Sequence, residues 1–365
     1  MSAVITPNGR YLGRKPDSPD PRDRRFLIAH PEAVATPLPP SVDLRNRLPA
    51  CFDQGNLGSC TANAGAGLMS FLFPAKPAFS RLQIYYDTRD LEGDIADDSG
   101  GETRDVMKAL QQDGAAPESE WPYDVAKFAD PLSAQVVADA TQSKLGQYSR
   151  LSTENEFLLC LASEFPYLLG FECPDYIDSD AIAAHGVFWL PGTVNPTFVG
   201  GHDVLIVGYD LHFKSNPDFL ASGVDPTLVQ DEALMVRNSW GTSWGIPDKP
   251  GHFWMPMSWA SNASTGGDSW TGRLAAPTAT KTVVPTIDGI PAIITSPPKG
   301  PPMTTTTSPM LTAEEITAAT PAVQAALDKL VPKWKQSLVG NEQALMTALV
   351  IAAVGAVDIV RNNQP

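Results

Sequence analysis

The chain has 365 residues, of which 43% are hydrophobic, so it is long enough for one large domain with extensions or for several domains. Its formal net charge of −15 argues against nucleic acid as a partner, because phosphate binding requires clustered positive charge. The longest apolar run, 344–357, is too short for an integral membrane segment, and no secretory signal is evident, which leaves the compartment open. The four cysteines, Cys51, Cys60, Cys160 and Cys173, do not make a disulfide scaffold.

Residues 1–37 are rich in proline, aspartate and arginine, which predicts an irregular or extended N-terminal extension. Within residues 1–41, six basic side chains stand against four acidic ones, whereas the segment 87–124 is strongly acidic. Attraction between these two parts of the chain is one interpretation of this pattern. A solvated tail of mixed charge is the other.

A body over residues 38–274 follows, in which helices precede strands. Ser59 is a candidate N-cap for a first helix rich in small residues. Further helices are predicted over 103–113 and 154–162, and strands over 167–173, 202–210, 232–240 and 252–256. His185 is also expected in a strand. Helices followed by strands indicate an α+β fold.

The composition changes after Arg273. Residues 275–310 contain the stretch PPKGPPMTTTTSP, which predicts a Pro/Thr-rich linker. Residues 311–365 predict a C-terminal helical segment whose last helix, 344–360, is apolar on nearly all faces and therefore requires burial. We expect a small helical bundle of its own; packing on the body, dimerisation, or binding of a partner or a membrane surface are the alternatives.

Three residues carry groups suited to nucleophilic catalysis. Cys60 stands at a predicted helix start, where the helix dipole lowers the pKa of a thiol, although a lone cysteine in a tight turn is often only a small buried hydrophobe. His202 heads an apolar strand behind two glycines, which allow a backbone or a ligand to approach closely. Asn238 ends a later strand and can orient an imidazole, and Trp240 can shield that hydrogen bond from water.

Taken together these motifs are more specific than any one of them. The histidine follows the cysteine by 142 residues and the asparagine follows the histidine by 36. The stretches QGNLGSC, GGHDVLIVGYD and VRNSWGTSWG, together with the segment 99–124, resemble in order the signatures of the papain-like cysteine peptidases. The resemblance covers about residues 40–258. It implies a fold of two lobes, one helical and one an antiparallel sheet or barrel, with a cleft between them.

The resemblance also implies roles for single residues. Cys60 would be the nucleophile, His202 the general base and acid, Asn238 its orienting partner, and Gln54 a donor to the oxyanion. The substrate would lie along Gly100, Gly101, Gly201 and Trp240. The partner would be a peptide or protein, without a cofactor and without a metal, because no Cys/His cluster has zinc-ligand spacing.

The sequence departs from the family at two places near the nucleophile. Leu57 replaces a cysteine that is usually paired in a disulfide, and Thr61 replaces a tryptophan, but neither change removes a chemical group of the reaction. The insert 211–233 either decorates the surface, which we favour, or shapes a cleft wall. Residues 1–37 either plug the cleft or form a disordered tail.

Two other functions remain open at this point. The same Cys–His pair could serve a transferase or a deamidase. A catalytically silent papain-fold binding module is the third reading, although the retention of all four site residues argues against it.

Overall fold

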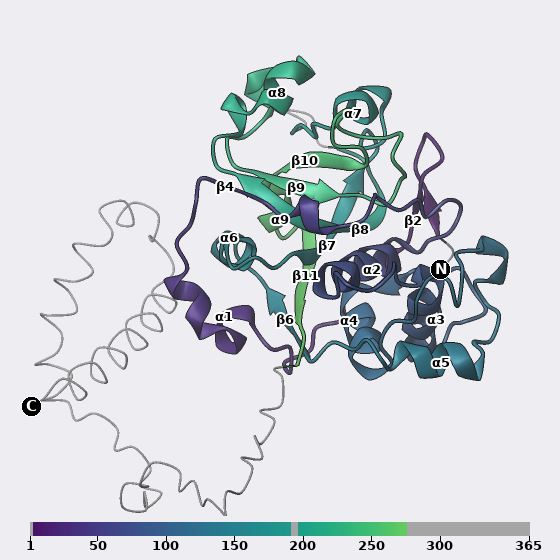
Figure 1. Cartoon of the computed structure of the whole chain (residues 1–365). Helices are drawn as coiled ribbons and strands as arrows, with labels where there is room; N and C mark the ends of the chain where they lie inside the picture. The colour runs from purple at the N-terminus through teal and green to yellow at the C-terminus, as the bar shows by residue number, and fades with distance from the viewer. Residues whose placement is uncertain (1–2, 191–195, 276–365) are drawn as a thin grey trace, which may run out of the picture. The chain divides into compact units, whose positions relative to one another are not determined.

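The computed structural model describes residues 3–190 and 196–275 (Figure 1). The predicted linker beyond residue 275 and the predicted helical segment 311–365 lie outside these ranges. Within the described ranges, no helix combines the length and the apolar character needed to cross a bilayer.

The centre of the described chain is an antiparallel sheet of seven strands. In spatial order it contains β10, β9, β8, β7, β11 and β6, and β4 pairs with the end of β8. The strands are β4 (Ser41–Asp43), β6 (Gln147–Leu151), β7 (Tyr167–Pro174), β8 (Phe198–Asp210), β9 (Ala233–Arg237), β10 (His252–Pro256) and β11 (Gly266–Arg273). β7 and β9, the neighbours of β8, contain no exposed residue, and their side chains are mostly apolar apart from Glu172 and Arg237.

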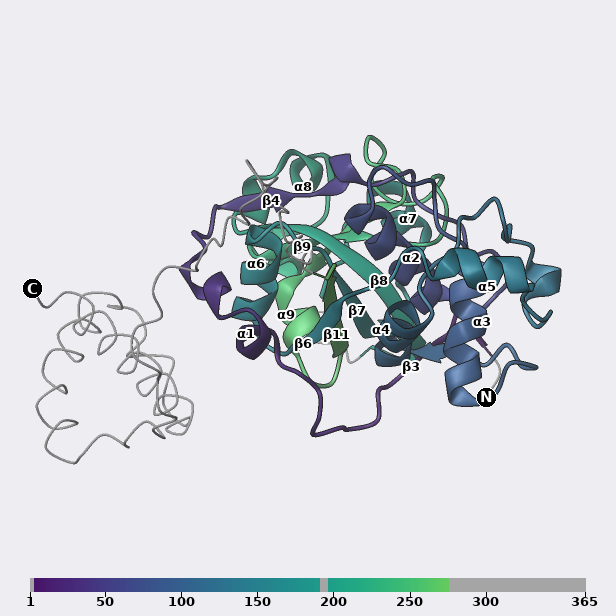
Figure 2. The ribbon, with the colours of Figure 1, turned by 60° about the horizontal axis from the view of Figure 1, so that its bottom comes forward.

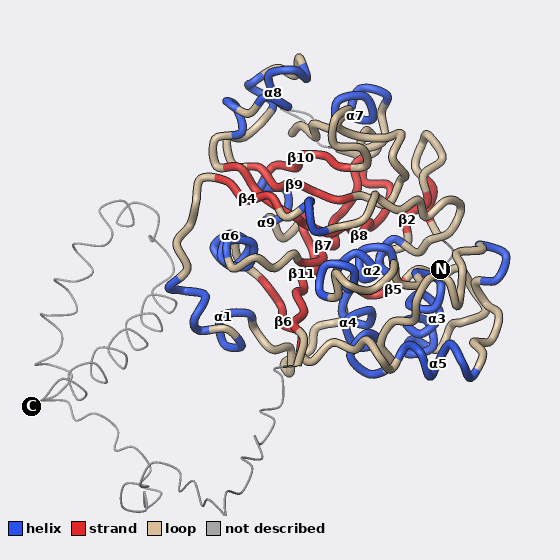
Figure 3. Tube along the Cα trace, in the orientation of Figure 1, coloured by secondary structure: helices blue, strands red, loops and turns tan. Residues whose placement is uncertain are grey.

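Most of the longer helices gather on one side of the molecule. These are α2 (Cys60–Leu72), α3 (Arg81–Glu92), α4 (Thr103–Gln112) and α5 (Ala134–Ala140). Figure 3 shows them in blue, beside the red strands of the sheet. The others are α1 (Phe26–Ala29), α6 (Glu154–Ala162), α7 (Asp180–His185), α8 (Pro217–Ser222) and α9 (Met257–Ser261), with short 3-10 turns at Pro31–Ala35, Arg45–Arg47, Val125–Lys127, Phe213–Ser215 and Pro226–Leu228.

Helix α2 lies in the interior, and twelve of its thirteen residues are buried. Its small residues allow this position. A Cβ on Gly65 would lie 2.7 Å from Val106 of α4, and one on Gly67 would lie 3.1 Å from Leu205 of β8. Larger side chains would therefore force the helix away from the sheet.

The N-terminal residues add two small pairings to this body. β1 (Val4–Ile5) pairs with β2 (Tyr11–Leu12) as a hairpin. β3 (Arg14–Lys15) runs parallel to β5 (Gly101–Glu102) and lies against β8 (Figure 2). β3 therefore lies between β5, which directly precedes helix α4, and strand β8 of the sheet.

The α+β prediction is confirmed, and the predicted helices 103–113 and 154–162 lie where α4 and α6 do. The expectation of a strand at His185 is wrong, because this residue ends α7, which Ser179 caps through a hydrogen bond to the Ile182 amide. Ser59 does occupy the N-cap position of α2, but its side chain makes no capping bond. It instead shares a hydrogen bond of 2.5 Å with the hydroxyl of Tyr123.

Candidate active site

Cys60 is the first residue of α2 and is fully buried. Burial and, after it, the nearby Asp203 carboxylate raise the pKa of its thiol to about 12. The backbone N–H groups of Asp203, Gly13 and Thr61 act on the sulfur in the opposite sense. In this closed state Cys60 is therefore a neutral thiol.

His202 lies on β8, next to Asp203, and is also fully buried. Its Nε2 lies 2.8 Å from Asn238 Oδ1, which also accepts the backbone N–H of Ser239 at 2.8 Å. Two donors identify Oδ1 as the acceptor, so Nε2 carries the proton of the neutral ring. Nδ1 has no hydrogen-bond partner within the described chain and is left free to accept a proton.

The surroundings of His202 keep its ring dry. Trp240 stacks on it with the ring centroids 4.9 Å apart, and Phe171 meets it edge-on at 5.8 Å. Burial lowers the pKa of His202 to about 4, and the bond to Asn238 opposes that shift. Trp240 thus covers one face of the His202 ring.

Gln54 is held by three hydrogen bonds. Its Oε1 accepts from Ser239 Oγ at 2.6 Å, and its Nε2 donates to Leu57 O at 2.9 Å. The same Nε2 donates to the backbone oxygen of Tyr11 at 3.0 Å. A carbonyl oxygen of the N-terminal segment therefore occupies the donor that the sequence assigns to an oxyanion.

Gly100, Gly101 and Gly201 line the path of that segment. The Gly101 amide donates to Gly13 O at 2.8 Å, and a Cβ on Gly100 would lie 1.9 Å from the same oxygen. A Cβ on Gly201 would lie 2.6 Å from Arg14 O. The backbone of residues 13 and 14 thus lies where side chains on these glycines would otherwise stand.

We call residues 3–18 the strap: they begin with the β1–β2 hairpin, and residues 11–15 cross the site in extended form. Ala3 N donates to Asp98 O at 2.8 Å, and Asn8 N donates to Asp178 Oδ2 at 3.0 Å. Lys15 Nζ lies 2.6 Å from Glu92 Oε2 and 2.8 Å from Asp94 Oδ2, which belong to the acidic segment 87–124. The attraction inferred from the sequence charges is therefore present as ion pairs.

A second cysteine–histidine pair lies outside this site, and no sequence motif predicts it. Cys51 Sγ is 3.6 Å from His252 Nδ1 and 3.5 Å from Arg237 Nη1. Cys51 and His252 line a groove of about 380 Å³, which Arg45 and Lys249 also line. The two residues are 201 positions apart, and only the pairing of β9 with β10 places Arg237 opposite His252.

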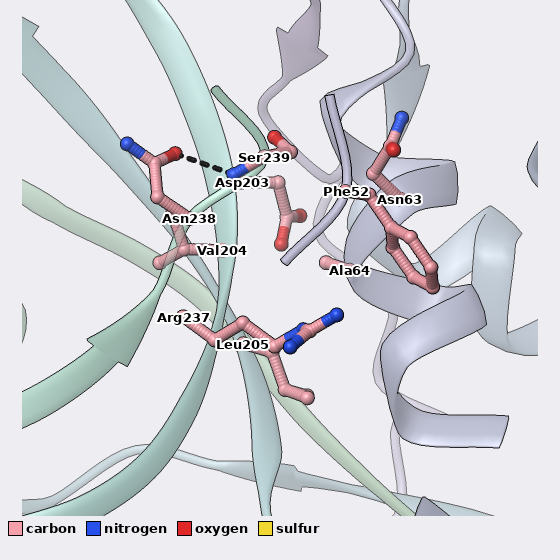
Figure 4. Close-up of a pocket in the computed structure, with 9 residues that line it drawn as sticks. All are labelled: Phe52, Asn63, Ala64, Asp203, Val204, Leu205, Arg237, Asn238 and Ser239. Carbon is pink, nitrogen blue, oxygen red and sulfur yellow. Dashed lines mark hydrogen bonds between the residues drawn. The ribbon is translucent and has the colours of Figure 1, made fainter. Parts of the chain in front are cut away.

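A small cavity of about 10 Å³ lies behind the candidate site, between α2 and strands β8 and β9 (Figure 4). Asp203, Arg237, Asn238 and Ser239 line it, and its volume matches about one water molecule. No group of three or more His, Cys, Asp or Glu side chains within the described residues is arranged to hold a metal ion.

A buried helix that begins with a cysteine, beside a sheet that carries a histidine bonded to an asparagine, is the arrangement of a cysteine-type peptidase. Comparison with known proteins agrees, since residues 38–263 match the family described as papain family cysteine protease. The chain belongs to this family and is a thiol protease, that is, a hydrolase.

Relatives support the assignment at two levels. The chain is 30% identical over 296 residues to an uncharacterized peptidase C1-like protein of Acanthamoeba polyphaga mimivirus, covering 74% of this chain and 88% of that protein. Xylellain, a cysteine protease from Xylella fastidiosa, matches with 31% identity and a TM-score of 0.61, covering 76% of this chain and 99% of that one. ProCathepsin B S9 from Trypanosoma congolense shares the fold at 17% identity and a TM-score of 0.54, covering 73% of this chain and 87% of that one.

Proposed function

We propose that the chain hydrolyses peptide bonds of peptide or protein substrates through Cys60, His202, Asn238 and Gln54. The orientation of His202 is the observation that carries this proposal. Its Nε2 is committed to Asn238, so the free Nδ1 is the nitrogen that can take the proton of Cys60. The Asp203 backbone N–H acts on the Cys60 sulfur, which ties the cysteine to the residue next to His202.

Proton transfer from Cys60 to Nδ1 yields a thiolate and an imidazolium. The sulfur then bonds to the substrate carbonyl carbon, and the oxygen takes up the negative charge beside Gln54 and the Cys60 amide. Each such donor contributes about 2.7–4 kcal/mol to lowering the barrier. The C–N bond breaks as His202 returns its proton to the leaving amine, and water hydrolyses the thioester with His202 as base.

We further propose that the strap inhibits this site. The Tyr11 carbonyl takes the Gln54 donor, and the backbone of residues 13 and 14 lies along Gly100, Gly101 and Gly201. Burial also favours the neutral thiol and the neutral imidazole over the charged pair. Release of the strap would return water and a free oxyanion donor to the site.

A single substitution in the full chain tests both parts. A Cβ on Gly13 would lie 1.8 Å from the backbone oxygen of Gly58, so Gly13→Val expels the strap without altering the proposed catalytic groups. Pro19→Val adds a β-branched side chain just beyond the strap at an exposed position and is the matched control. We expect Gly13→Val alone to raise Cys60 alkylation by iodoacetamide, followed by intact mass, and peptide cleavage by about tenfold or more.

The possible results separate the readings. Equal Cys60 alkylation rates in the unmodified chain, Gly13→Val and Pro19→Val would overturn the proposal that the strap inhibits the site. Fast alkylation of Gly13→Val without cleavage of a peptide mixture would favour a silent binding module. Mass analysis of the products distinguishes hydrolysis, which creates new termini, from transfer to an added amine and from deamidation, which leaves the chain length unchanged.

A further inference from the structure

The side chain of Arg14 enters a buried pocket beside the proposed nucleophile. Only 3% of this side chain is exposed. Nη1 lies 3.0 Å from Glu172 Oε1 on β7, and Nη2 lies 2.5 Å from Asp268 Oδ2 on β11. A guanidinium thus bridges two carboxylates that come from neighbouring strands of the sheet.

The walls of this pocket fit a flat guanidinium. A Cβ on Gly170 would lie 2.6 Å from Arg14 Nε, and a Cβ on Gly267 would lie 2.5 Å from Nη2. Any side chain at either glycine would therefore occupy the space of the guanidinium. Two glycines and two carboxylates form a cavity shaped and charged for this one group.

The backbone places the pocket relative to the reaction. The backbone N–H of Gly13 acts on the sulfur of Cys60. Arg14 pairs with Gly101 between strands β3 and β5, and its backbone oxygen lies over Gly201. Arg14 follows Gly13 along the strap, so an extended substrate that runs in the opposite direction over the same glycines would put the residue on the acyl side of the scissile bond at the sulfur and the residue before it at this pocket.

The pocket retains an excess of negative charge once the strap has left. The carboxylates of Glu172 and Asp268 remain, and Arg150, whose Nη2 lies 2.8 Å from Asp268 Oδ1, is the cation that still pairs with them within the described residues. A carboxylate buried with an incomplete set of partners is costly. A substrate that supplies a cation removes this cost, whereas an apolar side chain does not.

We propose that the cleft selects peptides with arginine as the second residue on the acyl side of the scissile bond, bound between Glu172 and Asp268. This specificity rests on the proposed peptidase function of Cys60. Arginine satisfies both carboxylates at once through separate nitrogens. Lysine supplies one ammonium that cannot reproduce the planar fork, so it binds more weakly.

Peptidyl-aminomethylcoumarin substrates test this with the full-length Gly13→Val chain. All have glycine next to the scissile bond, as in the strap, and carry arginine, lysine, leucine or glutamate in second place. We expect kcat/KM to be about tenfold or more higher for arginine than for leucine, with lysine between them and glutamate lowest. Asp268→Asn in the Gly13→Val chain should abolish most of the difference in kcat/KM between the arginine and leucine substrates.

Two controls keep the outcome decisive. Glu172→Gln changes a carboxylate that is 31% exposed and should lower the arginine preference in a chain that still folds. Asp130→Asn removes an exposed carboxylate in the loop after Val125–Lys127 and should leave the preference unchanged.

The inference and the proposed function fail in different ways. Equal cleavage of the arginine and leucine substrates by Gly13→Val would mean that the pocket serves only the strap. An arginine preference that survives both Asp268→Asn and Glu172→Gln would also overturn the inference. Absence of cleavage of all four substrates and of a mixed peptide library would overturn the peptidase proposal, and the specificity with it.

Discussion

The two cysteine–histidine pairs of this chain have the same functional groups in different surroundings. His202 is held through Nε2 by an asparagine, and its Nδ1 is free. His252 instead has Nδ1 near two carbonyl oxygens, Pro250 O at 3.1 Å and Lys249 O at 3.3 Å, which fixes the proton on that nitrogen. Its Nδ1 therefore does not accept the Cys51 proton, and the nitrogen left to accept it is Nε2, 3.7 Å from the same sulfur.

The charges near the two pairs differ as well. Burial and, after it, the guanidinium groups of Arg237 and Arg45, which oppose an imidazolium, lower the pKa of His252 to about 4. For His202, burial is the cause that lowers the pKa, and the proposed release of the strap would relieve it. Closeness of a thiol and an imidazole is therefore insufficient for a nucleophile, because the charges around the ring must also tolerate an imidazolium.

The largest expected effect separates the two cysteines. In the Gly13→Val chain, Cys60→Ala should lower kcat/KM by about 10³-fold or more, because it removes the nucleophile. Cys51→Ala should leave kcat/KM within about twofold, since Cys51 touches no group of the reaction. Hydrolysis of the arginine substrate measures both. Comparable losses in the two variants would place Cys51 in the reaction.

A second prediction concerns the asparagine that distinguishes the two histidines. Asn238→Ala in the Gly13→Val chain should lower kcat by about tenfold or more with little change in KM, because the ring loses the partner that fixes its Nε2 proton. Steady-state kinetics give the two constants separately. A change confined to KM would mean that Asn238 binds substrate and does not orient His202.

The sequence predicts the residues of the Cys60 site but not the pocket around Arg14. The motifs around Cys60, His202 and Asn238 are short stretches in which local sequence and site coincide. Arg14 and Asp268, by contrast, are 254 positions apart, and Asp268 lies in a polar stretch, GGDSW, without strand alternation. Helix α3 was missed because its Ile, Tyr and Thr residues favour strands, whereas the Ser80 cap and the left-handed Gly93 determine its ends.

The pH dependence of strap release gives a third prediction. Burial and, after it, the neighbouring Asp268 raise the pKa of Asp17 from its ordinary 3.8 to about 7. The Arg104 amide, 3.0 Å away, and Trp270 Nε1, 2.7 Å away, oppose this shift. The closed strap thus binds a proton that the released strap gives up.

The sign follows from that difference. The stabilisation of the closed state is complete below about pH 3.8 and is lost as the pH rises through about 7. The Cys60 alkylation rate of the unmodified chain, divided by that of Gly13→Val at each pH, should rise between pH 5 and 7 by at most about tenfold per unit and then level off. Asp17→Asn should flatten this rise, and a ratio that falls with pH would contradict the assignment.

The smallest expected effect concerns the stability of the second pair. Cys51 is 8% exposed and packs beside Gly251, where a Cβ would lie 2.3 Å from Cys51 Cβ. Cys51→Ala removes one sulfur and the partner of Arg237 Nη1, which keeps its 2.6 Å bond to Pro49 O. We expect a loss of about 1 kcal/mol in the free energy of unfolding, measured by urea titration.

Cys160→Ala, at a fully buried thiol 3.3 Å from Phe165 O, is the matched control and should cost at least as much. A loss several times larger at Cys51 alone would contradict this estimate. It would show that the contact of Cys51 with His252 and Arg237 stabilises the fold around Pro49 by more than the burial of one thiol accounts for.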